Sequence, residues 1–148
     1  MTQSRPVSKN VRIIEPMIAL ARCTQQDLIL VAGSKAIELM SVLQHRGYLR
    51  AAATATCGHP AKQYGIALVD WRQRSLQALE TTLVWLVDYL NPAGAVVVWV
   101  DPQKPAANQN LQATLERHGF RVEAGTAYEY GSAILARRFE TSPVSQAA

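Results

Sequence analysis

Three short turns hold the side chains best suited to bind a small molecule or to act on one. They are Gly33-Ser34-Lys35, Thr54 to Cys57 and Asp70-Trp71, and each follows a run of small or apolar residues. In the first turn, Gly33 would allow a ligand to approach the backbone, Ser34 could donate a hydrogen bond, and Lys35 could face an anion. A plain turn in which Ser34 caps the next helix explains the same residues, so both interpretations stay open.

Asp70 is the candidate catalytic residue, because a carboxylate at the end of a buried strand could orient or deprotonate a substrate. Trp71 beside it could stack on a base or a cationic group. The plainer alternative is a solvated turn acid followed by a tryptophan at the core edge. The candidate cofactor-binding residues are Gly33, Ser34, Lys35, Thr56 and Trp71. Asp101-Pro102, which also follows a predicted strand, is a weaker candidate.

Several other chemistries are disfavoured by spacing. Cys57 and His59 stand too close together for a tetrahedral metal site and have no further ligands nearby, so no metal site is predicted. Cys23 and Cys57 are too few for a disulfide framework. The G-x-S-x-G elbow of hydrolases and the phosphate-binding G-x-x-x-x-G-K-[ST] loop are both absent.

The positive charge of the 148-residue chain is concentrated at one end. The net charge is +4, and Arg5, Lys9 and Arg12 lie in residues 1–12, which contain no acid. Because the remainder is nearly neutral, the sequence predicts a flexible basic arm over residues 1–12 and disfavours a nucleic-acid groove. No apolar run is long enough to span a membrane and no secretory signal is evident, so we expect a cytoplasmic protein.

Apolar runs of strand length alternate with helical patterns along the rest of the chain. Strands are predicted at Leu28–Val31, Leu49–Thr56, Ile66–Val69, Ala95–Val100, Arg121–Ala127 and Ser132–Phe139. Helices are predicted at Pro16–Cys23, from Ser34 to Gly47, from Ser75 to Leu90 and at Asn108–His118. A single domain over residues 13–140 follows, with a frayed tail at 141–148.

This alternation predicts an α/β fold: a doubly wound, mostly parallel Rossmann-like sheet with helices on both faces. The last two strands are too close together for a crossover, so they predict a C-terminal antiparallel hairpin. Ligands of such sheets bind beyond the carboxyl ends of the parallel strands. That edge, which we call the carboxyl rim, is where Gly33, Asp70 and Asp101 should lie.

The second half of the sequence resembles the class I S-adenosylmethionine-dependent methyltransferases. Tyr64–Asp70 resembles the strand of that family that ends in an acidic residue, and Leu83–Val98 resembles its helix, Pro-Gly turn and central strand. Leu111–Phe120 and Val122–Arg138 resemble its last helix and terminal hairpin. The similarity extends over residues 27–139, but the glycine-rich first motif is reduced here to Gly33.

The resemblance implies a small methyltransferase-like protein that binds S-adenosylmethionine through the candidate residues at the carboxyl rim, with Asp70 acting on the methyl acceptor. The alternative is a non-catalytic Rossmann-like module that serves binding or oligomerisation and has lost its cofactor. Whether the protein is an enzyme is left open. A small-molecule ligand and a homodimer are the partners expected.

Overall fold

Helices and strands alternate along the part of the chain that the computed structural model describes, residues 9–33, 35–53, 63–71, 75–101, 105–128 and 131–138. The helices are α1 (Lys9–Ala21), α2 (Ala36–His45), α3 (Leu76–Tyr89) and α4 (Pro105–Arg117). The strands are β1 (Ile29–Gly33), β2 (Ala51–Ala53), β3 (Tyr64–Asp70), β4 (Leu90–Val100), β5 (Phe120–Tyr128) and β6 (Gly131–Arg138).

The strands form one mixed sheet in the order β2-β1-β3-β4-β6-β5. β1 to β4 are mutually parallel, whereas β6 runs antiparallel to both β4 and β5. The predicted α/β class, the mostly parallel sheet and the antiparallel C-terminal hairpin are therefore confirmed.

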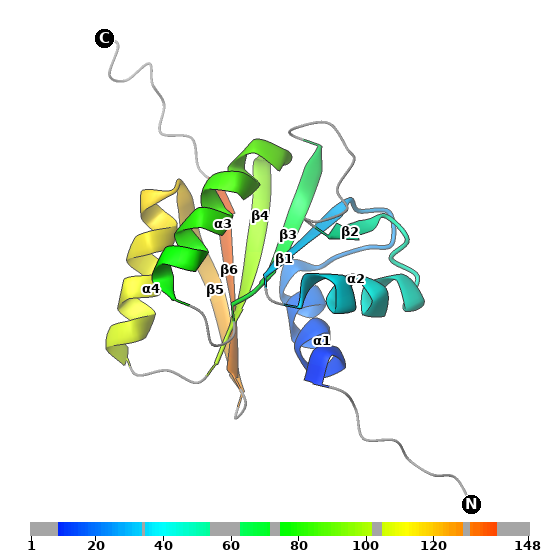
Figure 1. Ribbon diagram of the computed structural model, residues 1–148, viewed down its shortest axis with the longest axis horizontal. Coiled ribbons are helices and arrows are strands. Elements are labelled where there is room, and N and C mark those ends of the chain that lie inside the picture. Colours follow the sequence, from blue (N-terminus) through cyan, green and yellow to red (C-terminus); the bar gives the residue numbers. More distant parts are fainter. Residues whose placement is uncertain are drawn as a thin grey trace, which may run out of the picture.

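Two apolar layers cover the sheet, one on each face (Figure 1). Side chains alternate between the faces along each strand, as the period of two requires. Leu79, Leu83 and Leu86 of α3 pack with Leu111 and Leu115 of α4 on one face. On the other face, side chains of α1 and α2 pack against side chains of the sheet. This second cluster contains Ile13, Ile14, Met17, Leu39, Leu43, Leu68, Val97 and Trp99. The two hydrophobic clusters are the core.

Helix α1 begins earlier than the sequence suggested. It starts at Lys9, and Pro16, which was predicted to open the helix, lies inside it. Ile13, Ile14 and Met17 are at most 2% exposed, so tertiary packing holds a turn that a helix-interior proline would weaken. The helix therefore takes in residues 9–12 of the segment predicted to be a flexible arm. Residues 1–8 and the tail at 139–148 lie outside the described residues.

The start of β4 also differs from prediction. The strand pairs with β3 through Leu90 and again from Ala95 onward, and the register shifts in between. Asn91 to Gly94 form the predicted turn, in which the Asn91 side chain accepts from the Ala93 N–H at 3.0 Å. The turn is thus a bulge within the strand rather than a separate loop.

Candidate functional site

The register of the sheet brings the predicted residues Gly33 and Asp70 together at the carboxyl rim. Gly33 of β1 is the partner of Asp70 of β3, and Asp70 is the partner of Trp99 of β4. Lys35 follows at the start of α2, and Asp101 follows the end of β4. In Figure 1 this rim is at the bottom of the sheet, where α3 and α4 begin. Ser34 and Thr56 lie outside the described residues.

Gly33 has a structural reason to be glycine. Its φ is +111°, and a Cβ at this position would lie 2.8 Å from both the carbonyl carbon and the amide nitrogen of Asp70. Such contacts are too close for any side chain. The glycine therefore allows the ends of β1 and β3 to approach each other, in addition to any role toward a ligand.

Lys35 takes the N-cap position of α2, which was predicted for Ser34, so that prediction is wrong by one residue. Its side chain makes no capping hydrogen bond and is 54% exposed, with Nζ 3.6 Å from Glu38 Oε2. An exposed pair of this kind holds the lysine weakly. The ammonium group is therefore available at the N-terminus of a helix, where anions are favoured.

Asp70 is completely buried, with 0% of its surface exposed. Leu68 faces α1 and α2 and Val69 faces α3 and α4, so alternation directs the Asp70 side chain to the α1–α2 face. Its register partner Trp99 is buried on that same face. The structure thus places a carboxylate in a covered position beside an indole ring at the carboxyl rim.

Trp71 is 6% exposed and belongs to the core on the α3–α4 face. Its backbone N–H donates to the Trp99 carbonyl at 3.0 Å, and its indole N–H donates to the Ser75 carbonyl at 2.8 Å. Ser75 in turn caps α3, because its hydroxyl accepts from the Ala78 N–H at 3.1 Å. Trp71 thereby fixes the start of α3 against the end of β3.

One rim residue was missed by sequence reasoning. Tyr128, at the end of β5, is 37% exposed, and its ring centroid lies 5.9 Å from that of the buried Trp99. The available signal was an aromatic residue directly after the strand predicted at Arg121–Ala127. That signal does not tell which face the ring occupies, because the register of the hairpin decides it.

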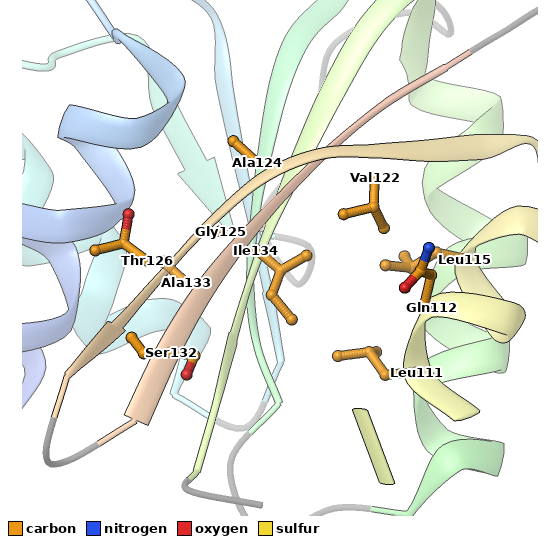
Figure 2. Close-up of a pocket in the computed structure, with 11 residues that line it drawn as sticks. Leu111, Gln112, Leu115, Val122, Ala124, Gly125, Thr126, Ser132, Ala133 and Ile134 are labelled. Atoms are coloured by element: carbon orange, nitrogen blue, oxygen red, sulfur yellow. The ribbon is translucent and has the colours of Figure 1, made fainter. Parts of the chain in front are cut away.

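A separate cavity of about 270 Å³ lies between α4 and the β5–β6 hairpin. Figure 2 shows Val122 and Ile134 pointing toward Leu111 and Leu115 of α4, while Thr126 points away from the helix. Gly125 and Ala127 leave this part of the hairpin without bulky side chains. Of the predicted site residues that the structure describes, none lines the cavity, which is on the face opposite to Asp70.

No group of three or more potential metal ligands occurs among the described residues. Within the same residues, no helix is long and apolar enough to cross a membrane.

No protein-family model matches this sequence, and no curated protein matches it. Solved structures do. The 1,6-didemethyltoxoflavin-N1-methyltransferase of Burkholderia thailandensis, solved with S-adenosylhomocysteine, matches with a TM-score of 0.60 and 13% identity over 88% of this chain and 78% of its own. A SAM-dependent methyltransferase from Aquifex aeolicus matches with a TM-score of 0.60 and 10% identity over 86% of this chain and 93% of its own.

The [4+2]-cyclase SpnF is similar as well, with a TM-score of 0.57 and 11% identity over 86% of this chain and 80% of its own. The chain therefore has the fold of the class I S-adenosylmethionine-dependent methyltransferases. At these identities the likeness establishes the fold alone, and the cyclase illustrates that this fold also carries other chemistry.

Proposed function

We propose that this chain is a small methyltransferase-like protein that binds S-adenosylmethionine at the carboxyl rim. The observation that carries the proposal is the buried Asp70 carboxylate, which lies beside Gly33 at the carboxyl end of a methyltransferase-like sheet. The position of this carboxylate is where ligands of doubly wound sheets bind.

The residues at the rim fit one end of the cofactor better than the other. The exposed Lys35 ammonium and the N-terminus of α2 suit the carboxylate of the methionine moiety. The stretch from Ala51 to Gln63 has no Asp or Glu to accept from the ribose hydroxyls, so the Thr56 hydroxyl is the candidate there. A neutral acceptor forms a hydrogen bond about half as strong as a charged one, so we expect weak binding.

When bound, S-adenosylmethionine supplies an electrophilic methyl group. The contribution of this chain would be to hold the acceptor in line with that group, since alignment is the main source of rate in such a transfer. Asp70 would orient the acceptor or remove its proton. Because Asp70 is covered in the structure described here, ligand entry has to expose it from the rim.

A second candidate is a non-catalytic module that keeps the sheet for binding or oligomerisation. The packing roles of Gly33 and Trp71 favour it, because both residues are explained without a cofactor. The predicted homodimer and the cytoplasmic location stay predictions under either proposal.

Calorimetric titration of the full chain with S-adenosylmethionine and S-adenosylhomocysteine separates the two candidates. We expect weak but saturable binding, accompanied by thermal stabilisation that grows with ligand concentration. Lys35→Ala should weaken binding by about 3- to 10-fold through loss of a charge-assisted contact. Arg50→Ala is the matched control, because this cation precedes β2 at the opposite edge of the sheet and binds the Gln26 carbonyl.

Asp70→Asn tests the carboxylate and should lower turnover more than cofactor binding. Gly33 is unsuitable as a binding test, because any side chain there meets the Asp70 backbone and disturbs the sheet. If millimolar cofactor gives neither heat nor stabilisation, the methyltransferase proposal fails and the non-catalytic module stands.

A further inference from the structure

Four large apolar side chains are exposed in the described part of the chain: Ile37, Leu49, Val84 and Tyr128. Of these four, only Tyr128 is aromatic. It ends β5, which runs parallel to β4, so its ring is at the carboxyl rim. The pairing of Tyr128 with Gly131, and of Trp99 with Ala133, puts Tyr128 and Trp99 on the same face of the sheet. Asp70 is directed to that face too.

The strand between the two aromatic residues lets their rings meet. On this face β6 presents only Gly131 and Ala133 between Tyr128 and Trp99. A Cβ at Gly131 would lie 2.7 Å from Cζ2 of Trp99, so the Trp99 ring occupies the space that a side chain there would need. The Tyr128 ring can therefore extend across β6 and rest on Trp99, with centroids 5.9 Å apart and planes tilted by 31°.

The result is an aromatic pair in which one ring is buried and the other faces solvent. Trp99 is 0% exposed and Tyr128 is 37% exposed. The buried ring fixes the exposed one, so a ligand that stacks on Tyr128 loses little side-chain entropy in doing so. Trp99 is also the register partner of Asp70, and adjacent strands lie about 4.8 Å apart. The exposed ring and the carboxylate thus lie on one face of the sheet at the carboxyl rim, with β4 and β6 between their strands.

We propose that Tyr128 is the platform on which this protein binds a planar aromatic acceptor. The inference rests on the proposed function, since it names the acceptor class for the same site. A flat ring stacks on Tyr128, whereas a saturated ring of equal size offers only apolar contact. Tyr128 is therefore a specificity-determining residue at the side of the rim away from Gly33 and Lys35.

The test compares 2-naphthol with its saturated counterpart, decahydro-2-naphthol, on the full chain labelled with 3-fluorotyrosine. The fluorine resonance of Tyr128 is assigned from its loss in Tyr128→Phe. We expect 2-naphthol to shift this resonance and to bind more tightly than the saturated alcohol. Tyr128→Ala should weaken 2-naphthol binding by about 3- to 10-fold, and Tyr128→Phe by less than about 2-fold, because it keeps the ring.

Tyr89→Ala is the matched control. Tyr89 also pairs with a tryptophan, Trp85, at a centroid distance of 4.2 Å, but it lies at the end of α3 that is remote from the rim. Loss of this second aromatic pair should leave 2-naphthol binding unchanged. Equal weakening by Tyr89→Ala would indicate a general effect on stability and overturn the proposal.

Two further results overturn it. They are equal affinity for the planar and saturated alcohols, and an absence of 2-naphthol binding. A chain that binds S-adenosylhomocysteine but shows no preference dependent on Tyr128 leaves the proposed function standing. A chain that does not bind S-adenosylhomocysteine refutes the proposed function, and the acceptor role of Tyr128 with it.

Discussion

The two ends of the sheet are built differently. In the C-terminal region, residues 63–138, β3 to β6 are 7, 11, 9 and 8 residues long and pair over most of their length. In the N-terminal region, residues 9–53, β1 has 5 residues and β2 has 3. The longer strands form more ladder hydrogen bonds and more cross-strand side-chain pairs. The strand pairing of the C-terminal region is therefore more strongly stabilised than that of the N-terminal region.

The N-terminal region nevertheless supplies part of the carboxyl rim. Gly33 and Lys35 belong to it, whereas Asp70, Trp71 and Tyr128 belong to the C-terminal region. The two regions join in the sheet through the pairing of β1 with β3, which ends at Gly33 and Asp70. The joint between the regions and the candidate site therefore coincide, and substitutions there should affect stability and ligand binding together.

The largest effect is expected from Gly33→Ala. The new Cβ would lie 2.8 Å from the Asp70 carbonyl carbon, and φ at +111° is unfavourable for alanine. We expect a loss of about 2–4 kcal/mol in the free energy of unfolding, measured by urea denaturation. Gly119→Ala is the control, since it shares a positive φ of +88° but has no neighbouring atom within 4 Å.

The control should cost about 1 kcal/mol, which is the conformational strain alone. Equal losses for the two variants would mean that close packing between β1 and β3 contributes nothing, and the idea of a critical joint would fail.

A smaller effect is expected within the C-terminal region, where Arg138 joins β6 to the end of α3. Its Nη1 donates to the Leu90 carbonyl at 3.1 Å and reaches the Val87 and Asn91 carbonyls at 3.5 Å. Because these carbonyls lie at and just beyond the helix C-terminus, Arg138→Met should cost about 1–2 kcal/mol in chemical denaturation.

The adjacent Arg137 provides the comparison. It forms a half-exposed pair with Glu123 at 3.2 Å, so Arg137→Met should cost less than about 1 kcal/mol. A larger loss for Arg137 than for Arg138 would contradict the capping role of Arg138.

The smallest effect is expected in the N-terminal region and only at high pH. Burial, aided by the charge of Asp27, raises the pKa of the Cys23 thiol to about 12. The thiol stays neutral in the folded chain while it ionises near pH 9 in the unfolded chain, so stability falls as the pH rises from about 9 toward 12. At pH 9 we expect the loss to be below about 1 kcal/mol.

Chemical denaturation at pH 7 and pH 9 measures this loss, and Cys23→Ala should abolish the part that depends on the thiol. In a Cys57→Ser background, Cys23 should also react slowly with iodoacetamide at pH 8, because little thiolate forms. Rapid alkylation under native conditions would show that the loop after α1 opens readily.

The fold could be predicted because each element has a local signature. Val96, Val97 and Val98 mark a buried strand, and the 3–4 residue spacing of Leu79, Leu83 and Leu86 marks an amphipathic helix. The errors occurred where packing overrode local preference. Pro16 lies inside α1 because Ile13, Ile14 and Met17 are buried against the sheet, and no local rule contains that contact.

The candidate site could be predicted only in part. Asp70 and Gly33 were identified because strand ends in such a fold lie at one edge. Their burial and mutual contact depend on register and on helices from distant parts of the sequence. Tyr128 was missed for the same reason, since its face follows from its pairing with Gly131.

The order of residue types along the chain was enough to predict an alternating α/β sheet with Gly33 and Asp70 at its carboxyl rim, because periodicity and turn chemistry are local properties. Three further features depend on long-range pairing: the close approach of Gly33 to Asp70, the covering of that carboxylate, and the placement of Tyr128 on Trp99. Each requires strands distant in sequence to adopt one register, and the free energy that selects that register comes from burying both faces of the sheet.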